Sequence, residues 1–225
     1  MGNLPVVKDC IESLYPIPEG WRLHIYDSNV SEIDGTKQYL KSAQSEKKFN
    51  LIDEDKFASH GEAVQKLTAE CKADWILHID SDAKLLDKNF YTRAQYFISK
   101  EKFKVWGRVD PTSVLPEFDK IPRIKLLRTY SWNILFDRDF FQSKKLSFSP
   151  KKVDKQIKFE NQSQERLFLW GDTSWQLFWE SSRLDLFGRY PDEMWKCWKH
   201  LDHATVNWKL ENGEKISEFI KNKPK

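Results

Sequence analysis

The sequence predicts an α/β fold in which a mixed, mostly parallel central sheet is flanked by helices. Along the first 100 residues, segments with apolar residues at helical spacing alternate with short apolar runs that suit strands. Such alternation is typical of a sheet whose parallel strands are joined by right-handed crossovers. The chain has 225 residues, enough for one substantial core. We therefore expect a single domain, divided into residues 1–100, residues 101–210 and a C-terminal tail at 211–225.

The first predicted helix covers Leu4 to Leu14, because its apolar residues recur every three or four positions and Pro5 suits a first helical turn. A strand follows from Arg22 to Asp27, where apolar and polar residues alternate before a polar loop. A fold of this class ordinarily has a strand ahead of its first helix. The pattern leaves open whether this edge of the sheet is built differently or whether the chain was shortened at its start.

The next elements continue the alternation. Asp34 opens a second helix, and residues 49–52 form a brief strand. Ser59 and Glu62 match a capping box, which predicts the start of a third helix at this point. That helix leads into the apolar run from Trp75 to Ile79, which suits a strand buried on both faces.

The second half of the chain has weaker patterns. We expect a helix at residues 89–98 and strands at 103–109 and 132–136. The Lys/Ser-rich stretch from 144 to 158 has little periodicity, and we predict a mobile loop there. Six of the ten tryptophans lie between residues 170 and 208, which makes the last quarter compositionally distinct.

Composition and charge exclude several classes of protein. The chain has 37 basic and 34 acidic residues, and the resulting charge of +3 neither demands nor excludes a polyanionic partner. No apolar stretch approaches the roughly 20 residues needed to cross a bilayer, and no signal-peptide pattern is visible. Three widely spaced cysteines disfavour a disulfide framework or a zinc–cysteine cluster. We expect a cytoplasmic protein, which the lysines of its tail could also hold at an anionic membrane surface.

The most informative feature is a pair of carboxylates directly after the apolar run 75–79. Asp80 and Asp82 emerge where this strand ends, and in parallel sheets ligands bind beyond the carboxyl ends of the strands. Two like charges so close repel each other unless a cation lies between them. Hard oxygen ligands favour Mg²⁺ or Mn²⁺. The sequence therefore predicts a divalent metal at Asp80 and Asp82, although an acidic turn after a strand is the simpler alternative.

Six segments resemble, in order, the motifs of family-2 glycosyltransferases with the GT-A fold. They are residues 7–14, 24–29, 34–36, 59–63, 78–83 and 169–175. The resemblance is good over residues 4–100 and looser over 130–205, whereas residues 105–128 have no clear counterpart. It implies that residues 1–100 bind a nucleotide sugar and that residues 101–210 bind an acceptor.

The resemblance also implies a donor, a cofactor and their ligands. The donor would be a nucleoside diphosphate sugar, with a UDP-sugar as the first choice, and the cofactor would be Mn²⁺ or Mg²⁺. The metal ligands would be Asp80, Asp82 and a histidine near the end of the catalytic region, with His203 preferred to His200. The residues contacting the nucleotide sugar would be Asp27, Ser28, His60, Gly61, Asp80 and Ser81.

On the acceptor side, the resemblance assigns the catalytic base to Asp172, which would take the proton of an acceptor hydroxyl. Trp170 and Gly171 would contact the acceptor, a glycan or a glycolipid. A base opposite the leaving group implies inversion at the anomeric carbon. Two simpler interpretations stay open: Asp172 suits a helix N-cap, and His78 lies inside the strand pattern, where a hydrogen-bonded core role is expected.

Three other functions remain possible on the sequence alone. The lysines of residues 144–158 and a pI of about 8.6 would suit a glycosyltransferase acting on DNA or another polyanion. A nucleotidyltransferase also uses a carboxylate pair and a divalent ion, but it releases pyrophosphate. A non-catalytic sugar-binding module would bind the nucleotide sugar without turnover.

Overall fold

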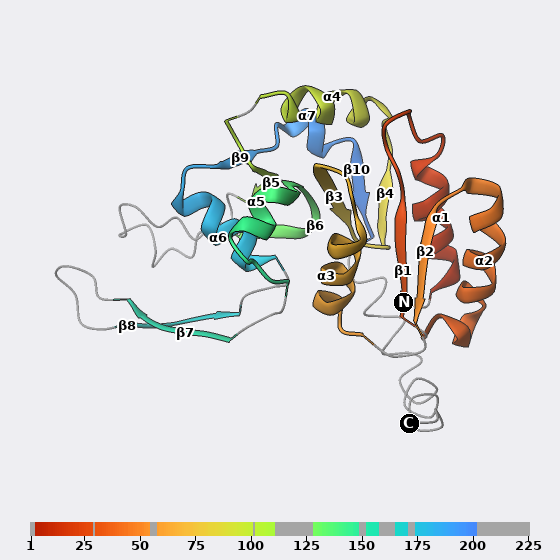
Figure 1. Ribbon diagram of the computed structural model, residues 1–225, viewed down its shortest axis with the longest axis horizontal. Helices are drawn as coiled ribbons and strands as arrows, with labels where there is room; N and C mark the ends of the chain where they lie inside the picture. The colour runs from red at the N-terminus through yellow and green to blue at the C-terminus, as the bar shows by residue number, and fades with distance from the viewer. Residues whose placement is uncertain are drawn as a thin grey trace.

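The computed structural model of the chain describes residues 3–28, 30–54, 58–100, 102–110, 128–148, 152–157, 165–170 and 174–201 (Figure 1). Helices and strands are mixed along the described chain, and the predicted α/β class is confirmed. None of the described helices combines the length and the apolar character that a membrane span requires.

The first quarter of the chain forms a pair of parallel strands packed against two helices. Its elements are α1 (Leu4–Leu14), β1 (His24–Ser28), the 3₁₀ helix η1 (Val30–Asp34), α2 (Thr36–Lys47) and β2 (Asn50–Glu54). β1 and β2 pair in parallel from His24↔Asn50 to Ser28↔Glu54. The apolar stripe of α1 meets that of α2 in a small core of Val7, Ile11, Leu40, Ala43 and Phe49. The predicted first helix is confirmed.

The third helix carries the chain into the strand that positions the site. Its elements are α3 (His60–Glu70), β3 (Trp75–Ile79), β4 (Ala83–Leu85) and α4 (Asn89–Ile98). The predicted capping box forms: the Ser59 hydroxyl accepts from the Glu62 N–H, and the Glu62 carboxylate accepts from the Ser59 N–H. Because two otherwise unsatisfied N–H groups are paired, α3 starts sharply at His60.

The largest described sheet has the strand order β3–β6–β5–β9. Its further elements are β5 (Val105–Asp110), β6 (Arg128–Asp137), α5 (Arg138–Ser143), α6 (Trp175–Arg183) and β9 (Phe187–Arg189). β6 returns antiparallel between β3 and β5, with Ile79↔Asn133 and Val105↔Phe136, and only the β5–β9 pair is parallel in this sheet. The described pairings are therefore more antiparallel than the strand–helix alternation of the first 100 residues indicates.

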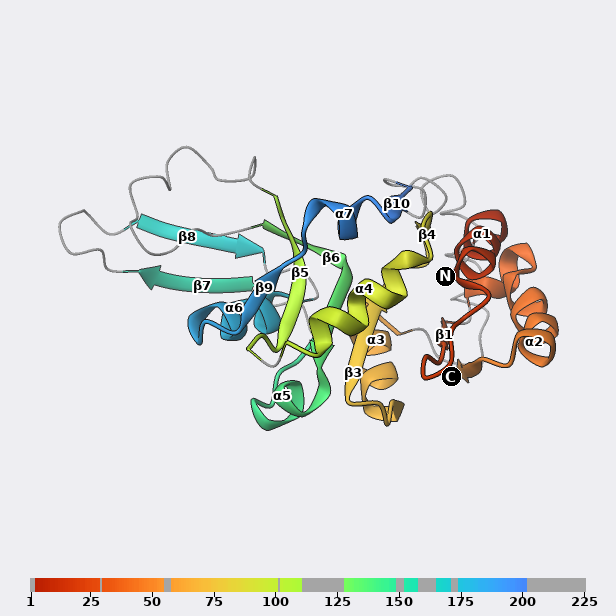
Figure 2. The same ribbon diagram turned by 90° about the horizontal axis from the view of Figure 1, so that it is seen from above.

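Two further strand pairs complete the described structure. β7 (Lys152–Ile157) and β8 (Glu165–Trp170) form an antiparallel ribbon, which projects from the side of the molecule opposite α1 and α2 (Figure 2). The predicted mobile loop at 144–158 is therefore wrong for residues 152–157, because pairing with a strand further along the chain supplies order that local periodicity cannot show. After α7 (Asp192–Trp195), β10 (Trp198–His200) pairs antiparallel with β4.

Two aromatic cores support the larger sheet from its two sides. One gathers around Phe90, Tyr190 and Trp198 and joins α4 to β10. The other includes Phe136 and Phe148 and packs α5 and α6 against the strands. Together they fix β3, β4 and β10 relative to one another. His78 lies on β3, His200 lies on β10, and the turn between β3 and β4 contains Asp80 and Asp82.

Candidate functional site

The backbone around Asp80 and Asp82 is held from three directions. The Asp80 N–H donates to the carbonyl of Trp132 on β6 at 3.0 Å, which continues the β3–β6 pairing. A tight turn follows, in which the Ala83 N–H donates to the Asp80 carbonyl at 3.1 Å. The carbonyl of Asp82 accepts from the Leu201 N–H at 2.9 Å, directly after β10. The predicted carboxylate pair therefore occupies a turn that belongs to the sheet framework.

The first cluster of the site consists of Asp80, Asp82 and His200. Ligand atoms of all three lie within 4.8 Å of one another. Asp82 is buried, and its Oδ1 lies 3.2 Å from Nε2 of His200. The His200 ring stacks on Trp132, with centroids 4.7 Å apart and an interplanar angle of 17°. This group is named the carboxylate cluster below.

The carboxylate cluster fits a divalent ion of the Mn²⁺ or Mg²⁺ class. Carboxylate oxygens suit both ions, whereas the imidazole nitrogen favours the transition metal. A cation between Asp80 and Asp82 would also neutralise two carboxylates that the fold holds together. The β4–β10 register places His200 opposite Ala83, and so the pairing of two three-residue strands delivers the third ligand.

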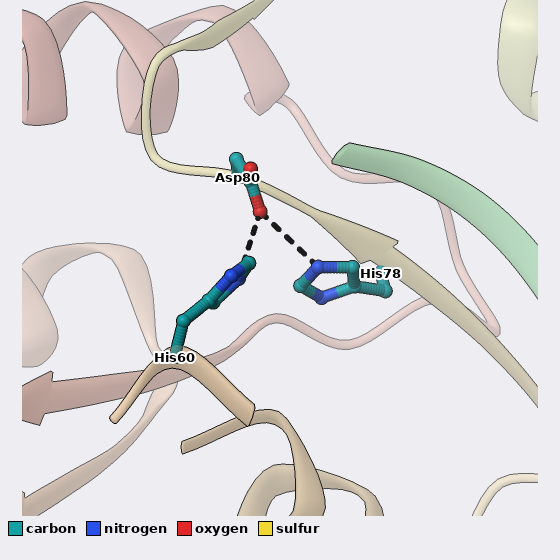
Figure 3. A group of neighbouring side chains, drawn as sticks. All are labelled: His60, His78 and Asp80. Atoms are coloured by element: carbon teal, nitrogen blue, oxygen red, sulfur yellow. Dashed lines mark ion pairs between the residues drawn. The ribbon is translucent and has the colours of Figure 1, made fainter. Parts of the chain in front are cut away.

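The second cluster surrounds the same aspartate from the other side. Nε2 of His60 and Nε2 of His78 lie 3.1 and 3.2 Å from Oδ1 of Asp80. Figure 3 shows both imidazoles directed at this carboxylate. His60 comes from the first turn of α3. His78 lies two residues before Asp80, and the alternation of side chains along β3 places His78 and Asp80 on the same face. His60, His78 and Asp80 are named the histidine cluster below.

The electrostatics of the site follow from burial and from these contacts. Burial alone would raise the pKa of Asp80, but pairing with His60 and His78 outweighs it, so that the pKa of this carboxyl lies well below its usual range. The thiol of Cys10 contacts the Asp80 carbonyl at 3.8 Å. Burial, followed by the charges of Asp82 and Asp80, raises the pKa of Cys10 to about 12. The Asp80 carboxyl is therefore held in its ionised form although it is largely enclosed by protein.

A pocket opens beside the histidine cluster, with about 180 Å³ for the centres of water molecules. His60, Asp80 and Ser81 line it, and so three of the residues predicted to contact the nucleotide sugar share one cavity. His78 lines it as well, a role beyond the core position that the sequence predicts for it. Apolar residues of α1 and α3 and residues 23–26 at β1 form most of the remaining walls.

Other predicted nucleotide contacts lie nearby in sequence but not in this lining. Asp27 is fully buried, and among the described residues neither of its carboxylate oxygens has a hydrogen-bond partner. Burying a carboxylate without a hydrogen-bond partner is costly, and a bound ligand or water that donates to it would offset this cost. Ser28 ends β1 opposite Glu54, and Gly61 is buried in the first turn of α3.

Several predicted residues fall outside the described part of the chain. These are the predicted base Asp172, the predicted acceptor contact Gly171 and the preferred metal ligand His203. Trp170 is described through its backbone, at the end of β8 opposite Lys152. These assignments stay predictions. His200, the other histidine considered, is the one that the structure brings to Asp82.

The sequence analysis did not predict that His60 and His78 both approach the Asp80 carboxylate. The signal was present: an i, i+2 spacing in a strand puts His78 and Asp80 on one face, and a helix start before that strand could bring a third group there. The pairing of β4 with β10 had no comparable signal, because three-residue strands leave no measurable periodicity.

Comparisons with known proteins identify the chain's relatives. The family model "Glycosyl transferase family 2" matches residues 3–157. No curated protein sequence matches the chain. The solved structure of glucosyl-3-phosphoglycerate synthase from Mycobacterium tuberculosis, in complex with Mn²⁺, UDP-glucose and phosphoglyceric acid, is 15% identical, with a TM-score of 0.54 over 84% of this chain and 65% of that chain.

Two further structures match over smaller shares. TarS residues 1–349 from S. aureus is 17% identical, with a TM-score of 0.50 over 66% of this chain and 48% of that chain. Mannosyltransferase PcManGT from Pyrobaculum calidifontis, in complex with GDP-Man and Mn²⁺, is 14% identical, with a TM-score of 0.49 over 63% and 43%. The chain thus spans less than half the length of these two proteins. At identities this low, structural similarity shows a shared fold alone. The superpositions on the M. tuberculosis and S. aureus structures show that this fold is of the GT-A type.

Proposed function

The chain belongs to glycosyl transferase family 2, and from this premise we propose that it is a metal-dependent enzyme that transfers a sugar, with inversion, from a nucleoside diphosphate sugar to a hydroxyl group of a glycan or glycolipid. The observation that carries the proposal is the carboxylate cluster, in which Asp80, Asp82 and His200 offer three ligand atoms within 4.8 Å at the carboxyl end of β3. Glycosyltransferase activity is supported by the family and by structural neighbours of the same fold.

The donor side of the reaction depends on residues of the first half of the chain. Asp82 and His200 would hold the ion, with Asp80 between the ion and the ribose. A bound Mn²⁺ or Mg²⁺ supplies the positive charge that stabilises a departing diphosphate. Asp27, buried and unpaired among the described residues, would accept a hydrogen bond from the nucleotide base. A UDP-sugar is the first donor to test, and the M. tuberculosis neighbour was solved with UDP-glucose.

The acceptor side requires a base. As the acceptor oxygen attacks the anomeric carbon, the bond from that carbon to the diphosphate oxygen breaks and the hydroxyl proton passes to a carboxylate. Asp172 is the proposed base, with Trp170 and Gly171 beside the acceptor. A single displacement of this kind inverts the anomeric centre.

The cellular setting is proposed from the cysteines. Cys10, Cys71 and Cys197 are all free thiols, which suits a reducing compartment such as the cytoplasm. Secretion into an oxidising compartment would leave Cys71, the least buried of the three, open to oxidation.

A thermal-shift panel tests the donor and the metal together. Nucleoside diphosphates and their sugar conjugates are added to the chain with and without Mn²⁺, and we expect one conjugate to raise Tm only when Mn²⁺ is present. Asp82→Asn should abolish this metal-dependent rise and sugar transfer alike, while the circular dichroism spectrum is preserved. Asp185→Asn, which removes an exposed carboxylate far along the chain, is the matched control. Full transfer by the Asp82 variant would reject the proposal.

A further inference from the structure

The histidine cluster brings two imidazoles to a single carboxylate oxygen. Nε2 of His60 and Nε2 of His78 both approach the same oxygen of Asp80, at 3.1 and 3.2 Å. His78 is buried, and its Nε2 and the Asp80 Oδ1 are fully enclosed. Yet within the described residues neither of these two atoms makes a hydrogen bond, because their close approach is poorly aligned. Two buried polar atoms in contact but misaligned need another explanation.

A shared cation provides that explanation. Ligand atoms around one metal point toward the ion and not toward each other. In a tetrahedral Zn²⁺ site, with ligand bonds of about 2.0–2.2 Å, neighbouring donor atoms lie roughly 3.3–3.5 Å apart, and wider coordination brings them closer. The separations of 3.1 and 3.2 Å are near this range. All three ligand atoms also lie within 4.8 Å of one another.

We propose that His60, His78 and Asp80 form a second metal site, which shares Asp80 with the carboxylate cluster and is selective for Zn²⁺ or a similar transition-metal ion. Two imidazoles and one carboxylate are a typical donor set for zinc and a poor one for Mg²⁺. Because all three residues line the same pocket, the fourth coordination position opens into that cavity and is available to water or to a ligand. The proposal concerns metal binding alone and is independent of the proposed transfer reaction.

The scaffold of this site suits a preformed metal centre. His78 is fixed within β3 and packs near Phe148, with ring centroids 6.4 Å apart. His60 is held at the first turn of α3, which the capping box of Ser59 and Glu62 anchors. Rigid elements on two sides therefore set the positions of the two imidazoles before any ion binds, which lowers the cost of organising the ligands.

Asp80 belongs to both clusters, and this overlap gives the second site a consequence. An ion bound by the histidine cluster would take the Asp80 carboxylate as a ligand, and the carboxylate cluster needs the same side chain. If the proposed function holds, Zn²⁺ should therefore inhibit Mn²⁺-dependent transfer. Binding measurements on the protein without any donor test the site itself.

The direct test is calorimetric titration of the full, chelator-treated chain with Zn²⁺, supported by the visible absorption of bound Co²⁺. His60→Gln and His78→Gln should each weaken Zn²⁺ binding at least about tenfold and change the Co²⁺ spectrum. His24→Gln removes a histidine that lines the same cavity but belongs to neither cluster, and it should leave the Zn²⁺ affinity and the Co²⁺ spectrum unchanged. His60 is partly exposed, so that its variant is expected to fold, and circular dichroism checks this point.

Two results would overturn the proposal. Zn²⁺ affinity and the Co²⁺ spectrum could be the same in both variants as in the wild type, which would leave His60 and His78 as simple partners of Asp80. Alternatively, His200→Gln could abolish Zn²⁺ binding while the other two variants retain it, which would assign the zinc to the carboxylate cluster. Loss of nucleotide-sugar binding in either case concerns the proposed function and not this site.

Discussion

The two halves of the described chain bury different kinds of side chain. Before residue 100, the buried set includes Asp27, Lys37, His78 and Asp82. After residue 100, the described buried polar residues are the uncharged Asn133, Ser174 and Ser181, and the core consists mainly of aromatic and aliphatic side chains. Buried charges destabilise a fold unless they are paired or bind a ligand. The described first half therefore holds the buried ionisable groups, and the described second half buries mainly apolar side chains and brings His200 to Asp82.

The largest expected effect tests the supporting role of the second half. Phe136 is fully buried on β6, with the rings of Phe141 and Phe148 at 5.6 and 5.7 Å. Phe136→Ala should lower the free energy of unfolding by about 3–5 kcal/mol because it leaves a cavity. Urea denaturation measures this loss, with Leu86→Ala at an exposed position as control. Losses below about 1 kcal/mol would show that the second half contributes little to the fold.

The next prediction concerns the ligand that crosses between the halves. His200→Gln removes the imidazole that pairs with Asp82 at 3.2 Å, and we expect Mn²⁺ affinity to fall about 10- to 100-fold. Thermal shift across a Mn²⁺ titration measures the change. His24→Gln is the matched control. Unchanged Mn²⁺ affinity would confine the metal site to the first half of the chain.

The same contrast decides what the sequence can predict. α1 and the capping box of α3 depend on spacing within a dozen residues, and both were predictable from local patterns. The end of a strand at Ile79, followed by a turn with Asp80 and Asp82, was also predictable, because the mainly apolar run 75–79 stops at these two carboxylates. α5 had a readable start as well, since the side chain of Asp137 caps the N–H of Phe140.

What could not be predicted depends on contacts between distant segments. β4 and β10 have three residues each and lie more than a hundred positions apart. Strands this short show no periodicity, and so their pairing could not be predicted from the sequence. The choice of His200 for the carboxylate cluster follows only from that pairing. β6 lies antiparallel between β3 and β5, and this position could not be predicted either. The period of apolar residues indicates which face of a strand is buried, but it does not indicate the direction of the neighbouring strand.

The Asp34 carboxylate should make the stability of the first half depend on pH. The Asp34 carboxylate accepts from the Leu4 N–H at 2.9 Å, the Asn3 N–H, and both the N–H and the hydroxyl of Thr36, and so joins α1 to α2. Burial raises the pKa of Asp34, but the hydrogen bonds from Thr36, Asn3 and Leu4 outweigh it, and the net pKa is lowered. Asp34→Asn should therefore cost about 1.5 kcal/mol at neutral pH.

The sign of the pH effect follows from that lowered pKa. The stabilisation by Asp34 is complete above the unfolded-state pKa of about 3.9 and is lost as pH falls through the lower folded-state value. The difference in unfolding free energy between the wild type and Asp34→Asn should therefore shrink below about pH 4. Urea denaturation at several pH values measures it, with Asp185→Asn as control. A difference that is constant with pH would assign the effect to hydrogen-bond geometry and not to charge.

The smallest expected effect concerns Ser59, the N-cap residue of the helix that carries His60. Ser59→Ala removes the cap that accepts the Glu62 N–H, and it should lower the free energy of unfolding by about 1 kcal/mol. Ser45→Ala, in an exposed part of α2, should change it by less than about 0.5 kcal/mol. Because His60 occupies the first position of α3, fraying of this turn should also weaken Zn²⁺ binding by the histidine cluster, while Mn²⁺ binding by the carboxylate cluster persists. Equal weakening of both ions by Ser59→Ala would mean that the two clusters respond as a single site.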